Sequence, residues 1–395
     1  MNILHISNND CSGAGLCAYR LHKSMQKEGF NSKMLVLNKT QDDDSVILVF
    51  QHRYKLYRLF HALLRKLHLF FCEYDKLVKL TKMYGVPFTR PQTPFDLSNH
   101  PMVLSADIIH LHWVDDFFNQ PKFFENVRKP IVWTLHDEGM FYGITHYHDI
   151  VFGDNPLEEK YRSLKINMTR KANNLHYVIL SQYFRRTFGS TPFLREHTFS
   201  IISNSVDCTK FHAYDKEESR RLLGLDNSFV YLSFLASDIA DAHKGLESLV
   251  ESLSMLNNDR FRVLAVGNDQ RFRGDEKVIT MGIIRDTDLL SRVLSASDYF
   301  VMPSLQEAFS QAPIEAMACG KPAIVTPVSG TEELITESNG VICENFSPSS
   351  IAEGIQLAIK RIYDPVLIRE DISNRFSPHN ITSQYIKVYE SLLER

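Results

Sequence analysis

PSLQEAFSQAPIEAMACGKP, residues 303–322, is the stretch from which the fold of this chain is most readily predicted. It is typical of a loop that turns into a short helix. Ser310 is a good N-cap, Pro313 is tolerated in the first turn, and Gly320 followed by Lys-Pro ends the helix. The apolar run 323–325 then predicts a buried strand.

Two glutamates in this stretch indicate its chemistry. Glu307 falls on the predicted loop, and Glu315 falls on the helix, eight positions later. Carboxylates accept hydrogen bonds from paired hydroxyl groups, and amides at a helix start stabilise anions. The segment is therefore suited to a phosphorylated, hydroxyl-rich ligand. The alternative is that both are solvent-facing helix carboxylates, as most glutamates are.

Strand-like apolar runs alternate with helical periodicity along most of the chain, which predicts parallel α/β layers. We expect two doubly wound, Rossmann-like domains with a boundary between about residues 185 and 210. The domains are 1–200, 201–372 and a C-terminal helix in 373–395 that closes onto the N-terminal domain. Ligands of such sheets bind beyond the carboxyl ends of the strands, so a central cleft between the two halves is expected. The predicted strands are 3–6, 34–37, 108–111, 131–135, 177–180, 199–202, 230–235, 262–266, 278–281, 299–302, 323–326 and 340–342.

Composition excludes several classes of protein. The 395 residues include 44 Lys+Arg and 47 Asp+Glu, a net charge of −3 that offers no general attraction to nucleic acid. The first residues begin a strand at once, with no secretory signal, and the apolar runs are too short to span a membrane. The six cysteines show neither C-x-x-C spacing nor a disulfide framework, which predicts a cytoplasmic protein.

Six short motifs follow one another along the chain. They are Ser12-Gly13-Ala14-Gly15, Thr134-Leu135-His136-Asp137, Asn204-Ser205-Val206-Asp207, Lys244-Gly245, Pro303-Ser304 ahead of the two glutamates, and Gly330-Thr331-Glu332-Glu333-Leu334-Ile335. Each motif alone is weak, but the set is specific, most sharply between Asn204 and Cys343. All six occur in the order found in retaining glycosyltransferases of family 4, which have the two-domain GT-B fold, and the chain resembles that family.

The resemblance implies roles for the residues of the opening stretch. It implies that Glu315 holds the ribose hydroxyls of a nucleotide. Glu307 and the backbone after it, at Ala308, Phe309 and Ser310, are implied to contact the transferred sugar.

Lys244 is the expected catalytic cation. Breaking a sugar–diphosphate bond builds negative charge on the leaving phosphates, and a fixed cation there stabilises the transition state. Members of the family usually carry an arginine about six residues before this lysine or just before it. Here those places hold Asp238 and His243, which leaves Lys244 as the cation of the loop with His243 assisting. The alternative is a surface lysine ahead of a helix.

The N-terminal half supplies the remaining candidates. Gly13, Ala14 and Gly15 form a tight turn at a helix start, where the backbone can approach a phosphate or a sugar. His136 follows a buried strand and is implied to be a catalytic residue that contacts the donor sugar or the acceptor, with Asp137 beside it as a substrate-binding residue. The alternative for His136 is a buried histidine bonded to a carbonyl.

The same region contains residues that could ligate a metal ion. Asp137 is close in sequence to His146, His148 and Asp149, but their spacing matches no known ligand signature. GT-B enzymes of the kind this chain resembles need no metal for catalysis. We therefore expect no metal site and no cofactor.

Residues 52–82 form a basic, amphipathic segment. The segment contains eight basic and two acidic residues, so its net charge is 8 − 2, or +6. A basic amphipathic helix suits an anionic bilayer surface. The alternative is a helix that covers the N-terminal sheet with its basic face in water. The apolar residues at helical spacing are Leu56, Leu59, Phe60, Leu63, Leu64, Leu67, Phe70 and Phe71.

The resemblance implies a metal-independent, retaining hexosyltransferase-type enzyme that moves a sugar from a nucleotide diphosphate donor to a hydroxyl of a saccharide or lipid-linked saccharide. We expect a role in bacterial surface polysaccharide biosynthesis, for example of lipopolysaccharide, at the inner face of the plasma membrane. Two alternatives stay open: a non-catalytic GT-B protein that binds a nucleotide sugar or glycan, and a GT-B nucleotide-sugar epimerase or hydrolase.

Overall fold

The structure, a computed structural model, describes residues 1–11, 13–67, 73–147, 155–256, 258–268, 272 and 274–394.

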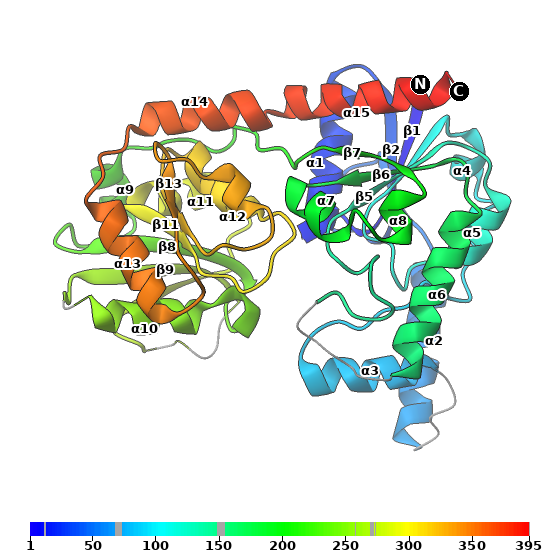
Figure 1. The fold of residues 1–395 in the computed structure, drawn as a ribbon, viewed down its shortest axis with the longest axis horizontal. Coiled ribbons are helices and arrows are strands. Elements are labelled where there is room, and N and C mark those ends of the chain that lie inside the picture. The colour runs from blue at the N-terminus through cyan, green and yellow to red at the C-terminus, as the bar shows by residue number, and fades with distance from the viewer. Residues whose placement is uncertain are drawn as a thin grey trace. The chain divides into compact units, whose positions relative to one another are not determined.

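The chain folds into two compact units (Figure 1). Unit 1 comprises Met1–Leu180, Phe184–Ile202 and Thr382–Arg395, and unit 2 comprises Ser181–Tyr183 and Ser203–Ile381. Each unit is a parallel sheet with helices on its faces, so the predicted fold class, two Rossmann-like α/β domains, is confirmed. The cleft between them stays a prediction.

The described strands of unit 1 form one seven-stranded parallel sheet in the order β3-β2-β1-β4-β5-β6-β7. The chain starts in the middle, builds outward to β3 and returns to the other side of β1, which makes the β1/β4 junction the topological switch point. Of these strands only β3 was not predicted, because a three-residue strand gives little periodic signal. The bounds are β1 (Asn2–Asn9), β2 (Asn31–Asn38), β3 (Val46–Leu48), β4 (Ile108–Leu111), β5 (Ile131–Leu135), β6 (Leu175–Ile179) and β7 (Thr198–Ile201).

Helices surround this sheet, and several start where the sequence supplies a cap. Asn119 and Asn155 accept a hydrogen bond from a backbone amide of the first turn, and a proline follows each of them at the helix start. The bounds are α1 (Gly13–Lys27), α2 (Gln51–Lys66), α3 (Glu73–Tyr84), α4 (Pro101–Ser105), α5 (Gln120–Asn126), α6 (Pro156–Arg170), α7 (Gln182–Phe188), α8 (Pro192–Arg195) and α15 (Pro378–Leu393).

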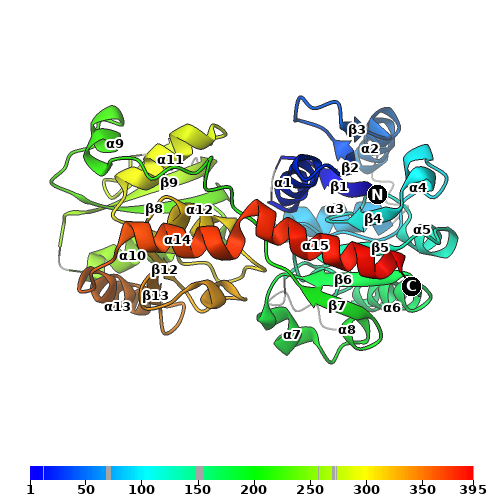
Figure 2. The ribbon, with the colours of Figure 1, turned by 90° about the horizontal axis from the view of Figure 1, so that it is seen from above.

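The last helix, α15, is fixed to unit 1 by buried polar contacts. Tyr389 OH lies 2.7 Å from His110 Nδ1, and Tyr385 OH lies 3.0 Å from Thr134 Oγ1. The Thr382 hydroxyl donates to Ser24 Oγ at 2.7 Å. Residues from Thr382 onward therefore belong to unit 1 although they are last in the sequence (Figure 2).

The basic segment 52–82 is not one helix. It forms α2 and α3, and residues 68–72 between them, with Phe70 and Phe71, lie outside the described part of the chain. Helices α2 and α3 are in contact, since His61 Nδ1 lies 3.2 Å from Asp75 Oδ2 and the rings of Tyr57 and Tyr74 are 5.4 Å apart.

The described strands of unit 2 form a six-stranded parallel sheet in the order β10-β9-β8-β11-β12-β13, so its switch point lies between β8 and β11. Successive residues of a strand face opposite sides, and both sides are apolar here, as a parallel sheet covered on two faces requires. Leu232 of β8 packs in the core with α10 and α13, whereas its neighbour Tyr231 packs with α11. The bounds are β8 (Val230–Asp238), β9 (Phe261–Asn268), β10 (Val278–Gly282), β11 (Tyr299–Met302), β12 (Ala323–Val325) and β13 (Gly340–Ile342).

The helices of unit 2 include the one predicted in the opening stretch. It spans Gln311–Ala318, and Gly320 follows it in the left-handed conformation with φ +76°. The bounds are α9 (Lys216–Leu222), α10 (Leu246–Met255), α11 (Thr287–Ala296), α12 (Gln311–Ala318), α13 (Pro348–Ile359) and α14 (Pro365–Phe376), with 3₁₀ turns at Ala242–Lys244 and Thr331–Leu334.

Candidate functional site

The loops after β8 and β11 meet at the switch point of unit 2. The amide of Leu305 donates to the carbonyl of His243 at 2.8 Å. Gly245 has φ +74°, and a Cβ built on it would lie 2.1 Å from the carbonyl oxygen of Pro303. The left-handed conformation and the close approach together explain why glycine follows Lys244 in this sequence.

This junction pairs two of the three residues expected to act in catalysis, of which His136 is the third. Lys244 Nζ lies 2.7 Å from Glu307 Oε1, and the hydroxyl of Ser304 donates to the same oxygen at 3.2 Å. The Lys244 side chain is 27% exposed, so its ammonium is held in place yet accessible to a ligand. The structure therefore brings Lys244 and Glu307 together across 63 positions of sequence.

The start of α12 offers backbone donors beside this ion pair. Within the described residues, the amides of Ala308, Phe309 and Ser310 make no hydrogen bond. Ser310 occupies the N-cap position, but its side chain makes no capping hydrogen bond, so the expected cap is only positional. Unpaired amides at the positive end of a helix form an anion-binding site. Glu315, on the same helix, is 7% exposed.

His243 and Asp238 occupy the places where the family usually has an arginine, and both serve the local turn. His243 Nδ1 lies 3.1 Å from Asp241 Oδ1, which also accepts from the His243 amide at 3.0 Å. The carboxylate of Asp238 accepts from the amide of Ala240 at 3.0 Å. His243 is thus held by its own loop next to Lys244.

In unit 1, the predicted glycine turn begins α1. Gly13 has φ +46°, and Ala14 follows it in the first turn. A Cβ on Gly15 would lie 2.3 Å from the carbonyl oxygen of Asn9, so Gly15 allows the first helical turn to pack on the end of β1. Its requirement for glycine comes from this packing. Contact of the turn with a ligand stays a prediction.

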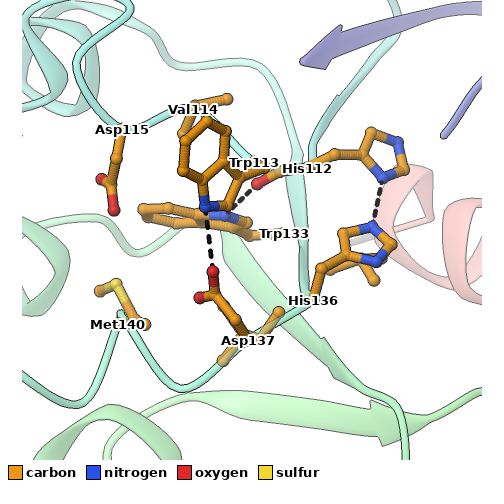
Figure 3. Close-up of a pocket in the computed structure, with 10 residues that line it drawn as sticks. His112, Trp113, Val114, Asp115, Trp133, His136, Asp137 and Met140 are labelled. Atoms are coloured by element: carbon orange, nitrogen blue, oxygen red, sulfur yellow. Dashed lines mark hydrogen bonds between the residues drawn. The ribbon is translucent and has the colours of Figure 1, made fainter. Parts of the chain in front are cut away.

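His136 and Asp137 line a pocket at the carboxyl ends of β4 and β5 (Figure 3). His136 Nε2 lies 3.0 Å from His112 Nδ1. Burial lowers the pKa of His136 to about 4, although Asp137 opposes the shift, so His136 is neutral at physiological pH. The pocket is lined by His112, Trp113, Val114, Asp115, Trp133, Thr134, Leu135, His136, Asp137 and Met140.

Asp137 is held by the protein on three sides. Its carboxylate accepts from Trp113 Nε1 at 3.0 Å and from the Gly139 amide at 2.9 Å, and it lies 2.8 Å from His146 Nδ1. Burial alone would raise the pKa of Asp137, but His146 and the Gly139 amide lower it to about 2. The same contact raises the pKa of His146 against the effect of burial. The buried His146 and the partly exposed Asp137 therefore form an ion pair that fixes the wall of the pocket.

Of the four candidate metal ligands predicted from the sequence, the described residues include Asp137 and His146. His146 binds Asp137 and Thr89, whereas His148 and Asp149 lie outside the described residues. The expectation that this region holds no metal stays a prediction.

Sequence reasoning missed a cluster of histidines behind the pocket. His5 of β1 pairs in register with His110 of β4, and His112 lies on the same face two residues later. Within the described residues, potential ligand atoms of these three buried side chains lie within 4.8 Å of one another. The i, i+2 spacing of His110 and His112 at a strand was the available signal, because it places both on one face of a sheet.

Residues 230–361 match the family model of glycosyl transferases group 1. This segment of the chain is similar to that family. Among curated proteins, it is 26% identical over 219 residues to the uncharacterized glycosyltransferase MJ1607 of Methanocaldococcus jannaschii, an alignment that covers 50% of this chain and 55% of that protein. The match thus spans about half the length of that relative.

Two further similarities concern a lipid-linked substrate and the fold. The chain is 24% identical over 271 residues to the N,N'-diacetylbacillosaminyl-diphospho-undecaprenol alpha-1,3-N-acetylgalactosaminyltransferase of Campylobacter jejuni, covering 60% of this chain and 70% of that enzyme. The solved structure of HepE from Anabaena in complex with UDP-glucose aligns with a TM-score of 0.62 and 18% identity, covering 99% of this chain and 100% of HepE. The fold of this chain is therefore the GT-B fold of its structural neighbours.

Among the described helices, none is both long and apolar enough to cross a membrane.

Proposed function

We propose that the chain is a retaining, metal-independent glycosyltransferase that transfers a sugar, such as a hexose, from a nucleotide diphosphate donor to a hydroxyl of a saccharide or lipid-linked saccharide. The observation that carries this proposal is the Lys244–Glu307 ion pair of 2.7 Å beside the unpaired amides at the start of α12. A cation next to amide donors at a sheet switch point suits a diphosphate.

In this reaction the bond between the anomeric carbon and the phosphate oxygen breaks, and a bond to the acceptor oxygen forms on the same face. The acceptor proton passes to the departing phosphate, and the products are a glycoside and a nucleoside diphosphate. Lys244 offsets the negative charge that grows on the phosphates. Glu307 holds the ammonium group through Oε1 and offers its carboxylate to sugar hydroxyls.

The remaining candidates bind and orient the substrates in this proposal. Glu315 receives the ribose hydroxyls, and the amides of residues 308–310 receive the donor. His136 and Asp137 belong to the pocket of unit 1, which receives the transferred sugar or the acceptor. The name of one relative supports a lipid-linked acceptor, since the Campylobacter jejuni enzyme acts on a diphospho-undecaprenol-linked sugar. Synthesis of a bacterial surface polysaccharide, in the cytoplasm at the inner face of the plasma membrane, is the corresponding process.

A panel of nucleotide sugars tests donor binding by thermal shift. A ligand at 100 times its Kd stabilises the folded state by about 2.7 kcal/mol, which is several degrees in the Tm of a domain of this size. We expect one base class to give this shift, and the Glu315→Ala variant to lose it for both the nucleotide sugar and the free nucleoside diphosphate. A panel in which no nucleotide sugar stabilises the protein, or an unchanged shift in Glu315→Ala, contradicts the donor site.

We propose in addition that α2 and α3 dock on an anionic lipid surface. Along α2 and just after its end, exposed apolar side chains are spaced so that they form one stripe. They are Leu56, Leu59, Phe60, Leu63 and, beyond the last helical residue, Leu67, which are 56–69% exposed. The face toward the protein is instead made by partly or fully buried side chains at positions 54, 57, 61 and 64.

Charge favours a bilayer as the occupant of this stripe. Exposed basic side chains accompany it on α2, at Arg53, Lys55, Arg58 and Lys66, and Lys76, Lys79 and Lys82 are exposed on α3. Each cation near an anionic surface contributes about 1 kcal/mol. An apolar stripe with flanking cations is the pattern of helices that lie in the interface plane.

Vesicle flotation tests the surface. We expect the chain to float with phosphatidylglycerol-containing vesicles and not with phosphatidylcholine alone. Lys55→Gln/Arg58→Gln/Lys66→Gln should weaken binding roughly 100-fold, and Leu56→Ser/Leu59→Ser/Leu63→Ser should abolish it. The matched control is Val366→Ser/Leu367→Ser on α14, whose side chains are 61% and 58% exposed. Equal flotation of all variants contradicts the proposal. Self-association of the wild type that the leucine substitutions abolish also contradicts it, because a second copy of the chain would then cover the stripe.

A further inference from the structure

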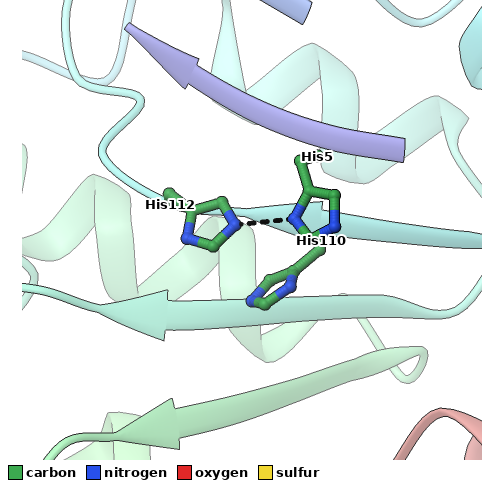
Figure 4. A group of neighbouring side chains, drawn as sticks. All are labelled: His5, His110 and His112. Carbon is green, nitrogen blue, oxygen red and sulfur yellow. Dashed lines mark hydrogen bonds between the residues drawn. The ribbon is translucent and has the colours of Figure 1, made fainter. Parts of the chain in front are cut away.

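Three histidines of unit 1 form a hydrogen-bonded chain that ends in the pocket. His5 Nδ1 lies 3.0 Å from His112 Nε2 (Figure 4), and His112 Nδ1 lies 3.0 Å from His136 Nε2 (Figure 3). His5 and His112 are buried at 0% and 3% exposure. Burial lowers the pKa of all three histidines below the ordinary value, and the neighbouring imidazoles lower those of His5 and His112 further. Each ring is therefore neutral, with one N–H and one bare nitrogen.

Neutral rings allow only two intact hydrogen-bond patterns along this chain. In the first, His5 Nδ1–H donates to His112, and His112 Nδ1–H donates to His136 Nε2, so His136 carries its proton on Nδ1. In the second, every donor is reversed, so His136 donates from Nε2 and its Nδ1 is bare. The tautomer of His136 is thus tied to that of His5 through His112.

The buried end of the chain favours the first pattern. His5 Nε2 is buried and has no hydrogen-bond partner among the described residues. In the second pattern that atom would be an N–H without an acceptor, whereas in the first it is a bare nitrogen. Orphaned buried N–H groups are rarer in proteins than unsatisfied acceptors. The first pattern should therefore predominate by roughly ten to one.

A metal ion held by His5, His110 and His112 is the competing reading of this cluster. Both nitrogens of His110 already have partners, Thr134 Oγ1 at 2.8 Å and Tyr389 OH at 2.7 Å. The His110 and His112 rings are tilted by 35° with their centroids 4.1 Å apart. Because imidazole lone pairs lie in the ring plane, rings packed this closely do not both direct a lone pair at one metal ion with the wide angle that tetrahedral ligands need. The hydrogen-bonded chain accounts for these contacts better.

We propose that His5 and His112 are positioning residues that fix His136 as its Nδ1–H tautomer, so that His136 donates a hydrogen bond to an oxygen of the sugar or acceptor in the pocket. Apart from its bond to His112, His136 makes no hydrogen bond within the described residues, which leaves Nδ1–H for a ligand. In this state His136 cannot act as a general base through Nδ1. The inference rests on the proposed function for the identity of the ligand, but the tautomer itself does not depend on it.

Nitrogen-15 NMR of histidine-labelled protein tests the tautomer without any assay of activity. The His136 signals are assigned from the spectrum of His136→Gln. We expect protonated Nδ1 and bare Nε2 for both His136 and His112 at pH 7.5. A His136 protonated at Nε2 overturns the proposal, and so does loss of the His5 and His112 signals to a stoichiometric bound metal when Zn²⁺ is added.

A pair of variants at His5 tests the coupling. His5→Leu removes the link, whereas His5→Asn keeps an amide nitrogen near the position of Nδ1. We expect His136 to become a mixture of tautomers in His5→Leu and to remain Nδ1–H in His5→Asn. A pure Nδ1–H tautomer in both variants contradicts a positioning role for His5. Because the wild-type spectrum is informative by itself, failure of either variant to fold leaves the test intact.

Activity measurements distinguish failure of this inference from failure of the proposed function. In steady-state transfer assays, we expect His5→Leu to lower kcat/KM about tenfold and His5→Asn less than threefold. If neither wild type nor variants turn over any nucleotide sugar while the spectra show the expected tautomer, the proposed function fails and the chain of histidines stands. If the wild type turns over a nucleotide sugar normally while the spectra show His136 protonated on Nε2, the inference about the histidine chain fails and the proposed function stands.

Discussion

Replacement of Lys244 by alanine is expected to lower kcat/KM for nucleotide-sugar turnover by roughly 100- to 1000-fold, the usual effect of removing one fixed group that stabilises transition-state charge. The ammonium of Lys244 lies 2.7 Å from Glu307, and His243 and Asp238 stand where the family that the sequence resembles usually carries an arginine. The effect should appear mainly in kcat, because the charge it meets grows in the transition state. Steady-state kinetics with the donor identified by thermal shift measure it.

Two controls separate this role from a structural one. Lys216 also pairs with a carboxylate of unit 2, Asp298, at 3.1 Å, and Lys216→Ala should leave kcat/KM within about twofold. The double variant Lys244→Met/Glu307→Gln removes the unpaired carboxylate that Lys244→Ala leaves behind. We expect it to stay inactive. Recovery of activity in the double variant would show that the ion pair only holds the two loops together.

Unit 1 is expected to lose most of its stability between pH 6.5 and pH 5. Burial lowers the pKa of each of five histidines below 6.5: His5, His22, His110, His112 and His136. Above pH 6.5 they are neutral in the folded and the unfolded chain. As the pH falls below 6.5, the unfolded chain takes up protons that the folded unit does not, and each such histidine lowers the free energy of unfolding by about 1.4 kcal/mol per pH unit. Asp116, whose pKa burial raises to about 7, and His146, whose pKa Asp137 raises against the effect of burial, act in the opposite direction, so they offset part of this loss. The net loss is still several kcal/mol, comparable to the stability of a typical domain.

Tryptophan fluorescence isolates this effect, since both tryptophans of the chain, Trp113 and Trp133, lie in unit 1. Urea midpoints measured from pH 8 to pH 5 should fall steeply below pH 6.5. His5→Leu should have a shallower pH slope, by up to about 1.4 kcal/mol per pH unit, whereas His52→Gln, at an exposed position, should keep the wild-type slope. Midpoints that do not change with pH contradict neutral burial of the histidines.

Local sequence signals were sufficient for the loop and helix at residues 303–322. The capping position Ser310, the helix end at Gly320 and the strand at Ala323 all depend on neighbours within a few residues. The pairing of Lys244 with Glu307 was not predictable from such signals, because it requires β8 and β11 to be neighbours at the switch point. Once the Rossmann order is assumed, both loops fall at the same place.

The chain of hydrogen-bonded histidines could not be predicted from local sequence signals. His5 and His112 are 107 positions apart, and only the register of β1 against β4 brings them into contact. Buried histidines are also hard to predict, because a strand that ends in a sheet core is expected to carry apolar residues. Polar side chains at His5 and His110 therefore gave no helpful hydropathy signal.

The segment 52–82 was predicted to be helical, but the sequence left open whether its apolar stripe faces outward, toward a bilayer, or covers the N-terminal sheet. The spacing of Leu56, Leu59 and Leu63 is the same for a helix that covers a sheet and for one that faces outward. The tyrosines at 54 and 57, on the other face, make the contacts with Phe95 that fix α2 to unit 1. Aromatic residues on the second face were the signal that distinguished the two cases.

The central claim, transfer of a sugar with retention, is tested most directly by following one reaction to its products. The chain is incubated with the donor and a saccharide or lipid-linked acceptor, while proton NMR records the anomeric configuration and nucleoside diphosphate release is measured. We predict that a glycoside with the anomeric configuration of the donor forms in step with the nucleoside diphosphate. Free sugar released in place of a glycoside, or a product of inverted configuration, would contradict the account.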